Sequence, residues 1–221
     1  MSDDDLPDWL RPVAEVAVRV RPEQLSRFLP PDEGGRESAV LMLFGEADHP
    51  GGRRRDVLLI ERAHDLRSHA GQVAFPGGAV DPDDDDVVAA ALREAAEETG
   101  LDPEGVHVFA TLPALFLPPS GFVVTPVLGW WRRPTDVAVV DPGEVASVHR
   151  VPLDELVDPA NRLLVRHPSG YVGAAFKLGD LIVWGFTAGL LDRLLRLAGW
   201  EVPWDRDHVE DLPPEHTGVT G

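Results

Sequence analysis

The sequence contains no cysteine among its 221 residues, which excludes disulfides, cysteine metal sites and thiol catalysis. It also lacks an apolar run near the roughly 20 residues that span a bilayer. Basic residues are scarce, because 20 Lys and Arg face 38 Asp and Glu and leave a net charge of -18. This excess argues against non-specific nucleic-acid binding and against docking on an anionic membrane. The acidic, proline-broken N-terminus does not resemble a secretory signal, so we expect a soluble cytoplasmic protein.

The acidic residues are concentrated in three segments. Residues 81–98 hold eight acids and one Arg, residues 201–221 hold six acids and one Arg, and four Asp lie among the first eight residues. Both chain ends are polar and contain proline, so we expect weakly ordered tails. The predicted organisation is an N-terminal arm over 1–35, one domain over 36–200 and an acidic tail over 201–221. The middle acidic segment needs another explanation.

Hydrophobic patterning predicts a sheet with few helices. Strand-length apolar runs occupy 38–44, 56–62, 72–75, 106–112, 122–130, 136–140, 147–151 and 171–178. Helices are expected at 87–99, from Leu153 onward and at 182–198, while 13–29 fits a short helix or a strand pair. The predicted fold class is therefore α/β (α+β), a mixed sheet flanked by helices in one domain.

Three glutamates converge on one side of the helix predicted at 87–99. Glu94, Glu97 and Glu98 stand at i, i+3 and i+4, which places their Cβ atoms roughly 5–6 Å apart. Three such carboxylates repel one another, and hard oxygen ligands suit Mg²⁺ or Mn²⁺. Arg93 lies four residues before Glu97 and could hold that carboxylate in position. A solvated acidic helix face is the competing interpretation, and the helix alone leaves both open.

The sequence around this helix resembles the Nudix box. Residues 77–81 read Gly-Gly-Ala-Val-Asp, and residues 93–101 read Arg-Glu-Ala-Ala-Glu-Glu-Thr-Gly-Leu. The resemblance implies a Nudix-type α/β/α sandwich with a central mixed sheet. It also implies a hydrolase of nucleoside diphosphates linked to another group, with a loop–helix–loop that binds divalent metal. The interval from Gly78 to Arg93 is one residue longer than usual, and an acid run containing Asp85 occupies the position of a Glu.

The segment before the box resembles the signature of the coenzyme A pyrophosphatase branch of the Nudix family. Residues 59–78 read Leu-Ile-Glu-Arg-Ala-His-Asp-Leu-Arg-Ser-His-Ala-Gly-Gln-Val-Ala-Phe-Pro-Gly-Gly, and the longer box also occurs in that branch. Later segments extend the likeness over most of 40–198. It implies cleavage of the diphosphate of coenzyme A or its thioesters to adenosine 3′,5′-bisphosphate and 4′-phosphopantetheine.

Arginines near the box are candidates for phosphate binding, because an acidic protein must gather its cations where coenzyme A binds. Guanidinium groups pair bidentately with phosphate, although Arg62 and Arg67 could instead form surface salt bridges with Glu61 or Asp65. Arg53 to Arg55 are expected in a solvated loop. The predicted substrate-binding residues are Arg62, Arg67, His69, Phe75, Gly77 and Gly78, where His69 suits fixing the loop better than acting as a base.

Hydrolysis requires a carboxylate that takes a proton from the attacking water. Glu98 is the first candidate because the helix would fix it beside the metal. Glu144, in the turn Asp-Pro-Gly-Glu at 141–144, is either a second candidate or only a turn residue. The predicted catalytic residues are thus Glu98, Arg93 and Glu144, and the predicted ligands of Mg²⁺ or Mn²⁺ are Glu94, Glu97 and Glu98.

Three other functions are weighed against this one. Another Nudix substrate, such as ADP-ribose, a dinucleotide or a nucleoside triphosphate, would use the same box. A non-catalytic Nudix-fold binding module would be expected to have lost carboxylates that are intact here. An acidic structural domain could assemble through the Leu-rich helix at 182–198, which is more often core, although a homodimer is compatible with it. We expect a small-molecule substrate and neither a nucleic-acid nor a membrane partner.

Overall fold

The computed structural model of the chain describes residues 6–31, 34–66, 69–118 and 120–216. Eight strands form a central sheet with the order β3-β2-β1-β7-β5, in which β4 also pairs with β1, β6 with β7 and β8 with β2. The sheet is mixed because β1 and β7 are parallel while the other pairs are antiparallel. Its strands are β1 (Arg36–His49), β2 (Gly52–Arg62), β3 (Val73–Ala74), β4 (Gly77–Ala79), β5 (Val106–Thr111), β6 (Leu115–Leu117), β7 (Phe122–Trp131) and β8 (Val145–Pro152).

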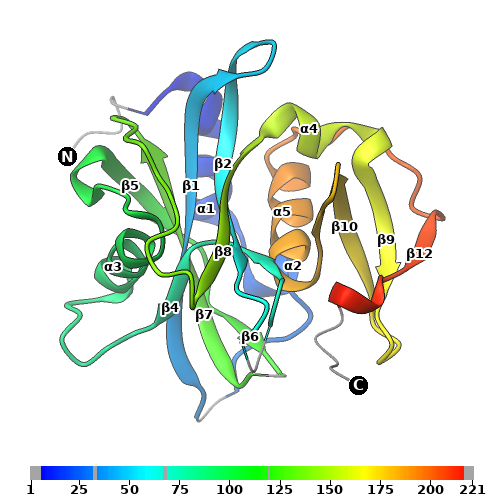
Figure 1. The fold of residues 1–221 in the computed structure, drawn as a ribbon, viewed down its shortest axis with the longest axis horizontal. Coiled ribbons are helices and arrows are strands. Elements are labelled where there is room, and N and C mark those ends of the chain that lie inside the picture. Colours follow the sequence, from blue (N-terminus) through cyan, green and yellow to red (C-terminus); the bar gives the residue numbers. More distant parts are fainter. Residues whose placement is uncertain (1–5, 32–33, 67–68, 119, 217–221) are drawn as a thin grey trace.

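Helices cover both faces of the central sheet, and a second sheet lies beyond one of them (Figure 1). The second sheet has the order β11-β10-β9-β12, with β9 (Arg162–Arg166), β10 (Val172–Leu178), β11 (Leu181–Val183) and β12 (Val209–Asp211). The helices are α1 (Arg11–Arg19), α2 (Pro22–Leu25), α3 (Val87–Thr99), α4 (Leu153–Val157) and α5 (Gly185–Leu197). The described residues also contain four short 3₁₀ turns: η2 (Asp8–Leu10), η3 (Pro103–Gly105), η4 (Pro159–Asn161) and η5 (Pro214–His216).

Alternation along β1 divides the core between the two faces of the central sheet, because successive strand residues point to opposite sides. Leu41 and Leu43 pack in the cluster that holds Ala91 and Ala95 of α3. Met42 packs in the larger cluster, with residues of α1 and α5. The predicted α/β/α sandwich is confirmed. The small alanines let α3 lie close to the sheet, with its carboxylates beside β4.

Residues at its two ends make α3 begin and end where the sequence predicted. The Asp86 side chain caps its first turn by accepting from two backbone N–H groups at 2.8 Å each, and Gly100 ends it in the left-handed conformation at φ +71°. The prediction of a strand at 136–140 is wrong. Backbone N–H groups of Ala138 and Val140 instead donate to carbonyls of Thr99 and Glu98 at 3.0 and 3.4 Å. These bonds satisfy carbonyls that the end of a helix leaves unpaired.

The expectation of weakly ordered tails is wrong for the described parts of both chain ends. Leu10, Val13 and Val16 recur at helical spacing within a polar sequence and are at most 1% exposed in the core. At the other end, Leu212 is 4% exposed, and β12 pairs in parallel with β9. Both ends therefore complete the packing of the domain. The described helices include none that is long and apolar enough to cross a membrane.

Two other predicted segments differ in the structure. Residues 52–55 belong to β2 instead of a solvated loop, because β1 and β2 pair as far as His49 and Gly52. The helix predicted from 182 begins at Gly185, because β11 occupies 181–183 and pairs with β10. Pairing between distant segments thus overrides the local pattern at both places.

Candidate active site

Strand β4 brings two backbone glycines against the carboxylates of α3. The Gly77 N–H donates to Glu98 Oε2 at 2.9 Å. Gly77 has φ +155°, which favours glycine. A Cβ at this position would also collide with the Ala39 carbonyl oxygen. A Cβ on Gly78 would overlap the carboxylate of Glu94. The glycine pair therefore allows the backbone to approach both glutamates, which accounts for these two glycines before the helix.

Glu98 is a buried carboxylate without a close ion-pair partner. Its side chain is 3% exposed, and among the described residues the nearest cation, Arg62 Nη1, lies 4.0 Å from Oε1, beyond hydrogen-bond distance. Burial raises the pKa of Glu98 to about 7, and the charges of Glu94 and Glu144 also raise it, against the Gly77 N–H and Arg62, which lower it. A carboxylate with a pKa near neutrality can accept and release a proton under ordinary conditions.

Two further glutamates lie close enough to sense this charge. Burial raises the pKa of Glu94, and the charges of Glu97 and Glu144 raise it further, while Arg93 opposes the shift. Glu144 is exposed on its turn, which is anchored by a 2.9 Å hydrogen bond from the Ala63 N–H to the Glu144 carbonyl oxygen. The fold thus brings Glu144 into the electrostatic neighbourhood of the α3 carboxylates, 46 residues from Glu98 in the sequence.

Arg93 holds the acidic segment together. Its Nε and Nη2 donate to Asp84 at 2.9 Å each, and its Nη1 donates to Glu94 at 3.0 Å and Glu97 at 3.1 Å. The hydrogen bonds to Asp84 are the largest cause of a raised Arg93 pKa, and Arg93 lowers the pKa of Asp84. The pairing of Arg93 with Glu97 is as predicted. Asp84, and not the exposed Asp85, is the member of the acid run that forms hydrogen bonds with Arg93, and Asp81 Oδ2 lies 3.7 Å from Arg93 Nη2.

The residues predicted to bind substrate are only partly gathered here. Arg62 lies beside Glu98, whereas Arg67 falls outside the described residues. His69 has φ +57° and its Nδ1 lies 2.9 Å from Gln72 Oε1, which fits a side chain that fixes its loop. Phe75 is 2% exposed in the hydrophobic core. Core packing covers its ring in this structure, and its role in substrate binding stays a prediction.

The carboxylates fit a divalent metal by their chemistry. Hard oxygen donors suit Mg²⁺ or Mn²⁺, and burial raises the pKa values of Glu94 and Glu98, a shift that the neighbouring Arg93 and Arg62 oppose without cancelling. Across the described parts of the chain, however, no three His, Asp or Glu side chains are already gathered to hold an ion. Glu97 is 61% exposed and turned toward Arg93, so ion binding requires side chains such as Glu97 to move.

Comparison with known proteins agrees with this arrangement. The chain matches the NUDIX domain family over residues 35–172. It is 39% identical over 200 residues to an uncharacterized Nudix hydrolase NudL from Citrobacter koseri, covering 86% of this chain and 92% of that protein. It is 41% identical over 171 residues to the NudL of Cronobacter sakazakii, covering 72% and 81%.

A solved structure supports the fold. The Nudix hydrolase RenU from M. Smegmatis superposes with a TM-score of 0.53 at 22% identity, covering 81% of this chain and 98% of that one. Nudix hydrolases generally use divalent metal ions, in keeping with the carboxylates of α3. The chain therefore belongs to the Nudix family and is a hydrolase of nucleoside diphosphate derivatives.

Proposed function

We propose that this enzyme cleaves the diphosphate of coenzyme A or its thioesters, releasing adenosine 3′,5′-bisphosphate and 4′-phosphopantetheine with Mg²⁺ or Mn²⁺ as cofactor. The observation that carries the proposal is the position of the described residues of 59–78, a segment whose sequence resembles the coenzyme A pyrophosphatase signature. This segment supplies Arg62, Gly77 and Gly78, and all three lie beside Glu94 or Glu98. Its resemblance and its position at the carboxylates support the same substrate.

The proposed proton acceptor is Glu98. The Gly77 N–H fixes one carboxylate oxygen at 2.9 Å, and the pKa of about 7 suits transfer of a proton from water near neutral pH. Glu144 is the second candidate, because its charge reaches both Glu94 and Glu98. A water proton taken by either carboxylate leaves hydroxide to attack phosphorus as the anhydride oxygen departs.

The other residues position the reacting groups. Arg93 and Asp84 orient Glu94 and Glu97, which with Glu98 would hold the metal. A bound divalent cation would neutralise phosphate oxygens and lower the pKa of its water. Arg62, beside Glu98 and 28% exposed, is placed to contact a diphosphate oxygen. Its Nε has no hydrogen-bond partner among the described residues, which leaves this guanidinium free to turn toward a phosphate.

A substrate panel tests the proposal. The purified protein is incubated with Mg²⁺ or Mn²⁺ and with coenzyme A, acetyl coenzyme A, ADP-ribose, NADH or a nucleoside triphosphate, and products are identified by mass. We expect 4′-phosphopantetheine to appear, with the highest kcat/KM for coenzyme A or its thioester. A higher kcat/KM for ADP-ribose, a dinucleotide or a nucleoside triphosphate would assign the enzyme to that substrate instead.

A further inference from the structure

A pocket of about 610 Å³ lies at the turn end of the β1–β2 hairpin, away from the α3 carboxylates. Its walls come from that hairpin, α4 and η2, together with Trp200, which lies just after the end of α5. In Figure 1 the hairpin tip and α4 lie toward the top of the view, whereas α3 and β4 lie lower and to the left. The volume is within the range of small-molecule sites, about 300–1,000 Å³.

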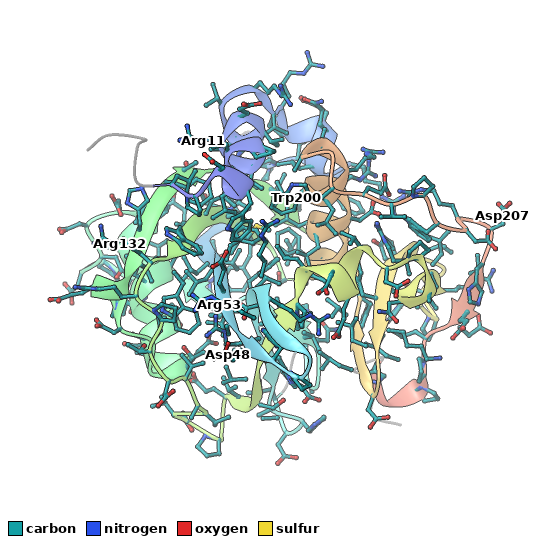
Figure 2. All side chains as sticks on the ribbon, turned by 90° about the horizontal axis from the view of Figure 1, so that it is seen from above. Arg11, Asp48, Arg53, Arg132, Trp200 and Asp207 are labelled. Carbon is teal, nitrogen blue, oxygen red and sulfur yellow. The ribbon has the colours of Figure 1, made fainter. Side chains whose placement is uncertain are left out.

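One wall of this pocket is aromatic. The rings of Trp9 and Trp200 have centroids 6.0 Å apart and are tilted by 38°, and both line the pocket. Figure 2 shows Trp200 beside the end of α5 and Arg53 on the hairpin. Two neighbouring indole faces offer a planar ligand a stacking surface.

The opposite wall carries cations whose charge is only partly compensated. Arg54 is satisfied, because Asp154 and Glu155 accept its hydrogen bonds at 2.7 to 3.0 Å. Arg55 stacks over the ring of Trp9 at 5.1 Å, and within the described chain no carboxylate forms an ion pair with it. Arg53 is 67% exposed, and its Nε lies 3.5 Å from Glu46. Arg53 is thus paired with Glu46, which also lines the pocket, but its side chain stays largely exposed, so an anion can approach it as well as Arg55.

The pocket is too far from the α3 carboxylates to share one nucleotide with them. Arg54 and Arg62 stand eight residues apart on the same strand, which corresponds to about 26 Å. We propose that the pocket is a second ligand site, which binds a nucleoside monophosphate with its base against Trp9 and Trp200 and its phosphate on Arg53 and Arg55. The aromatic surface and the paired guanidiniums match the two halves of that ligand. The proposal is independent of which substrate the α3 site hydrolyses.

Calorimetric titration with AMP tests this site. AMP contains no anhydride, so it is not turned over, and EDTA removes divalent metal from the α3 site. We expect one equivalent of AMP to bind the full-length protein and the R53A/R55A variant to lose at least tenfold in affinity. Both arginines are exposed, so the variant should fold, which a thermal unfolding curve checks. Arg27→Ala is the matched control, because Arg27 also stacks on an aromatic ring, at 4.8 Å from Phe28, outside the pocket.

Four further measurements separate the alternatives. AMP affinity that is unchanged by R27A and by Arg62→Ala, together with weak binding of adenosine alone and of inorganic phosphate alone, supports the proposal. AMP binding that survives R53A/R55A, or that Arg62→Ala abolishes, overturns it. Absence of binding at millimolar AMP does the same. Phosphate or adenosine binding as tightly as AMP contradicts a nucleotide site. Unchanged hydrolysis by R53A/R55A is expected, so this test stands apart from that of the α3 site.

Discussion

Two of the regions that bury carboxylates in this enzyme, around Glu98 and around Asp192, differ in how the carboxylate charges are compensated. At the α3 site, Glu98 has a backbone N–H at 2.9 Å and its nearest guanidinium at 4.0 Å. Glu94 and Glu144 add negative charge, and the Glu98 pKa rises to about 7. The free-energy cost of burying the Glu98 charge is therefore not offset by a close cation among the described residues. Such uncompensated groups are characteristic of sites that bind a cation or transfer a proton.

The second region lies between α5, β9 and the C-terminal segment. Arg162, with no exposed side-chain surface, donates to Asp192 and has Glu201 at 3.5 Å. Arg206 donates to Glu201 at 2.6 Å, and the Trp204 ring stacks under both guanidiniums at 4.7 and 4.5 Å. We call these five residues the Arg162 cluster. Its acids are paired, and the cluster ties the end of the chain to the domain.

The comparison shows that acidic composition alone does not indicate a cation site. Residues 81–98 and 201–221 are both strongly acidic. In the first, Arg93 pairs with Glu94, whereas Glu98 has only Arg62 at 4.0 Å among the described cations, and the proposed divalent cation would balance the remaining charge. In the second, arginines balance Asp192 and Glu201. We therefore expect substitutions in the two regions to affect different properties, catalysis in one and stability in the other.

Glu98→Gln should have the largest effect on activity. Replacing the proposed proton acceptor with an amide of the same shape is expected to lower kcat by about 10³-fold or more, because general acid–base steps alone contribute about 10²–10⁴-fold. Thermal stability should be kept or increased, since a buried charge is removed. Steady-state kinetics with coenzyme A measure the first and calorimetry the second. Glu104→Gln, at a side chain that is 87% exposed, is the control, and a fully active Glu98→Gln enzyme would refute the assignment.

Arg162→Met should produce the largest loss of stability. It leaves Asp192 buried without its closest cation, and breaking a buried ion pair from one side costs about 3–5 kcal/mol. Urea unfolding measures the loss, and kcat of the folded protein should remain close to that of the wild type. Arg166→Ala removes an exposed pair with Asp211 and should cost less than about 1 kcal/mol. A large loss of kcat with unchanged stability in Arg162→Met would show that the Arg162 cluster serves catalysis and not stability.

The stability of the metal-free enzyme should depend on the ionisation of Glu98. Its folded pKa of about 7 lies above the ordinary 4.5, so the folded state binds the proton more tightly than the unfolded state. Stability should therefore fall as pH rises from 4.5 to about 7, by at most about 3 kcal/mol. Urea unfolding with EDTA, compared between wild type and Glu98→Gln, isolates this contribution. Identical pH profiles for the two proteins would show that Glu98 ionises normally.

Asp84→Asn should have a smaller effect on the same site. It weakens the bidentate contact that orients Arg93 and, through Arg93, Glu94 and Glu97. Substitutions that support metal ligands indirectly lower affinity or activity by roughly 10–100-fold, and we expect a loss near the lower end. Asp85→Asn is the neighbouring control and should be nearly neutral. Equal losses in both variants, measured as kcat/KM and as the Mn²⁺ concentration for half-maximal rate, would mean that only the total charge of the acid run matters.

Much of the α3 site could be predicted because its information is local. Helical spacing places Glu94, Glu97 and Glu98 on one side, and Asp86 and Gly100 mark the ends of the helix. The two glycines before the helix are also visible in the sequence. Why glycine is required at both positions is visible only in the fold, where the backbone of β4 approaches the carboxylates of α3.

The features of the site and the fold that could not be predicted depend on contacts between segments distant in the sequence. Five acids stand between 81 and 86, and only the path of the loop makes Asp84 the one that accepts hydrogen bonds from Arg93, with Asp81 farther away at 3.7 Å. The burial of Phe75, like the contact of Arg162 with Asp192 across 30 residues, comes from packing that no local pattern records. The pairing of β12 with β9 likewise joins a segment predicted as a tail to one at which no strand was predicted.

Mn²⁺ binding, followed by the electron paramagnetic resonance signal of the free ion, tests most directly the claim that a divalent cation balances the α3 carboxylates. Wild type, Glu98→Gln and Glu94→Gln are titrated in the absence of substrate, with Arg166→Ala as the control. We predict that wild type and the control bind Mn²⁺ equally and that each glutamate variant loses about tenfold or more in affinity. Glutamate variants that bind Mn²⁺ as tightly as the wild type would contradict the account.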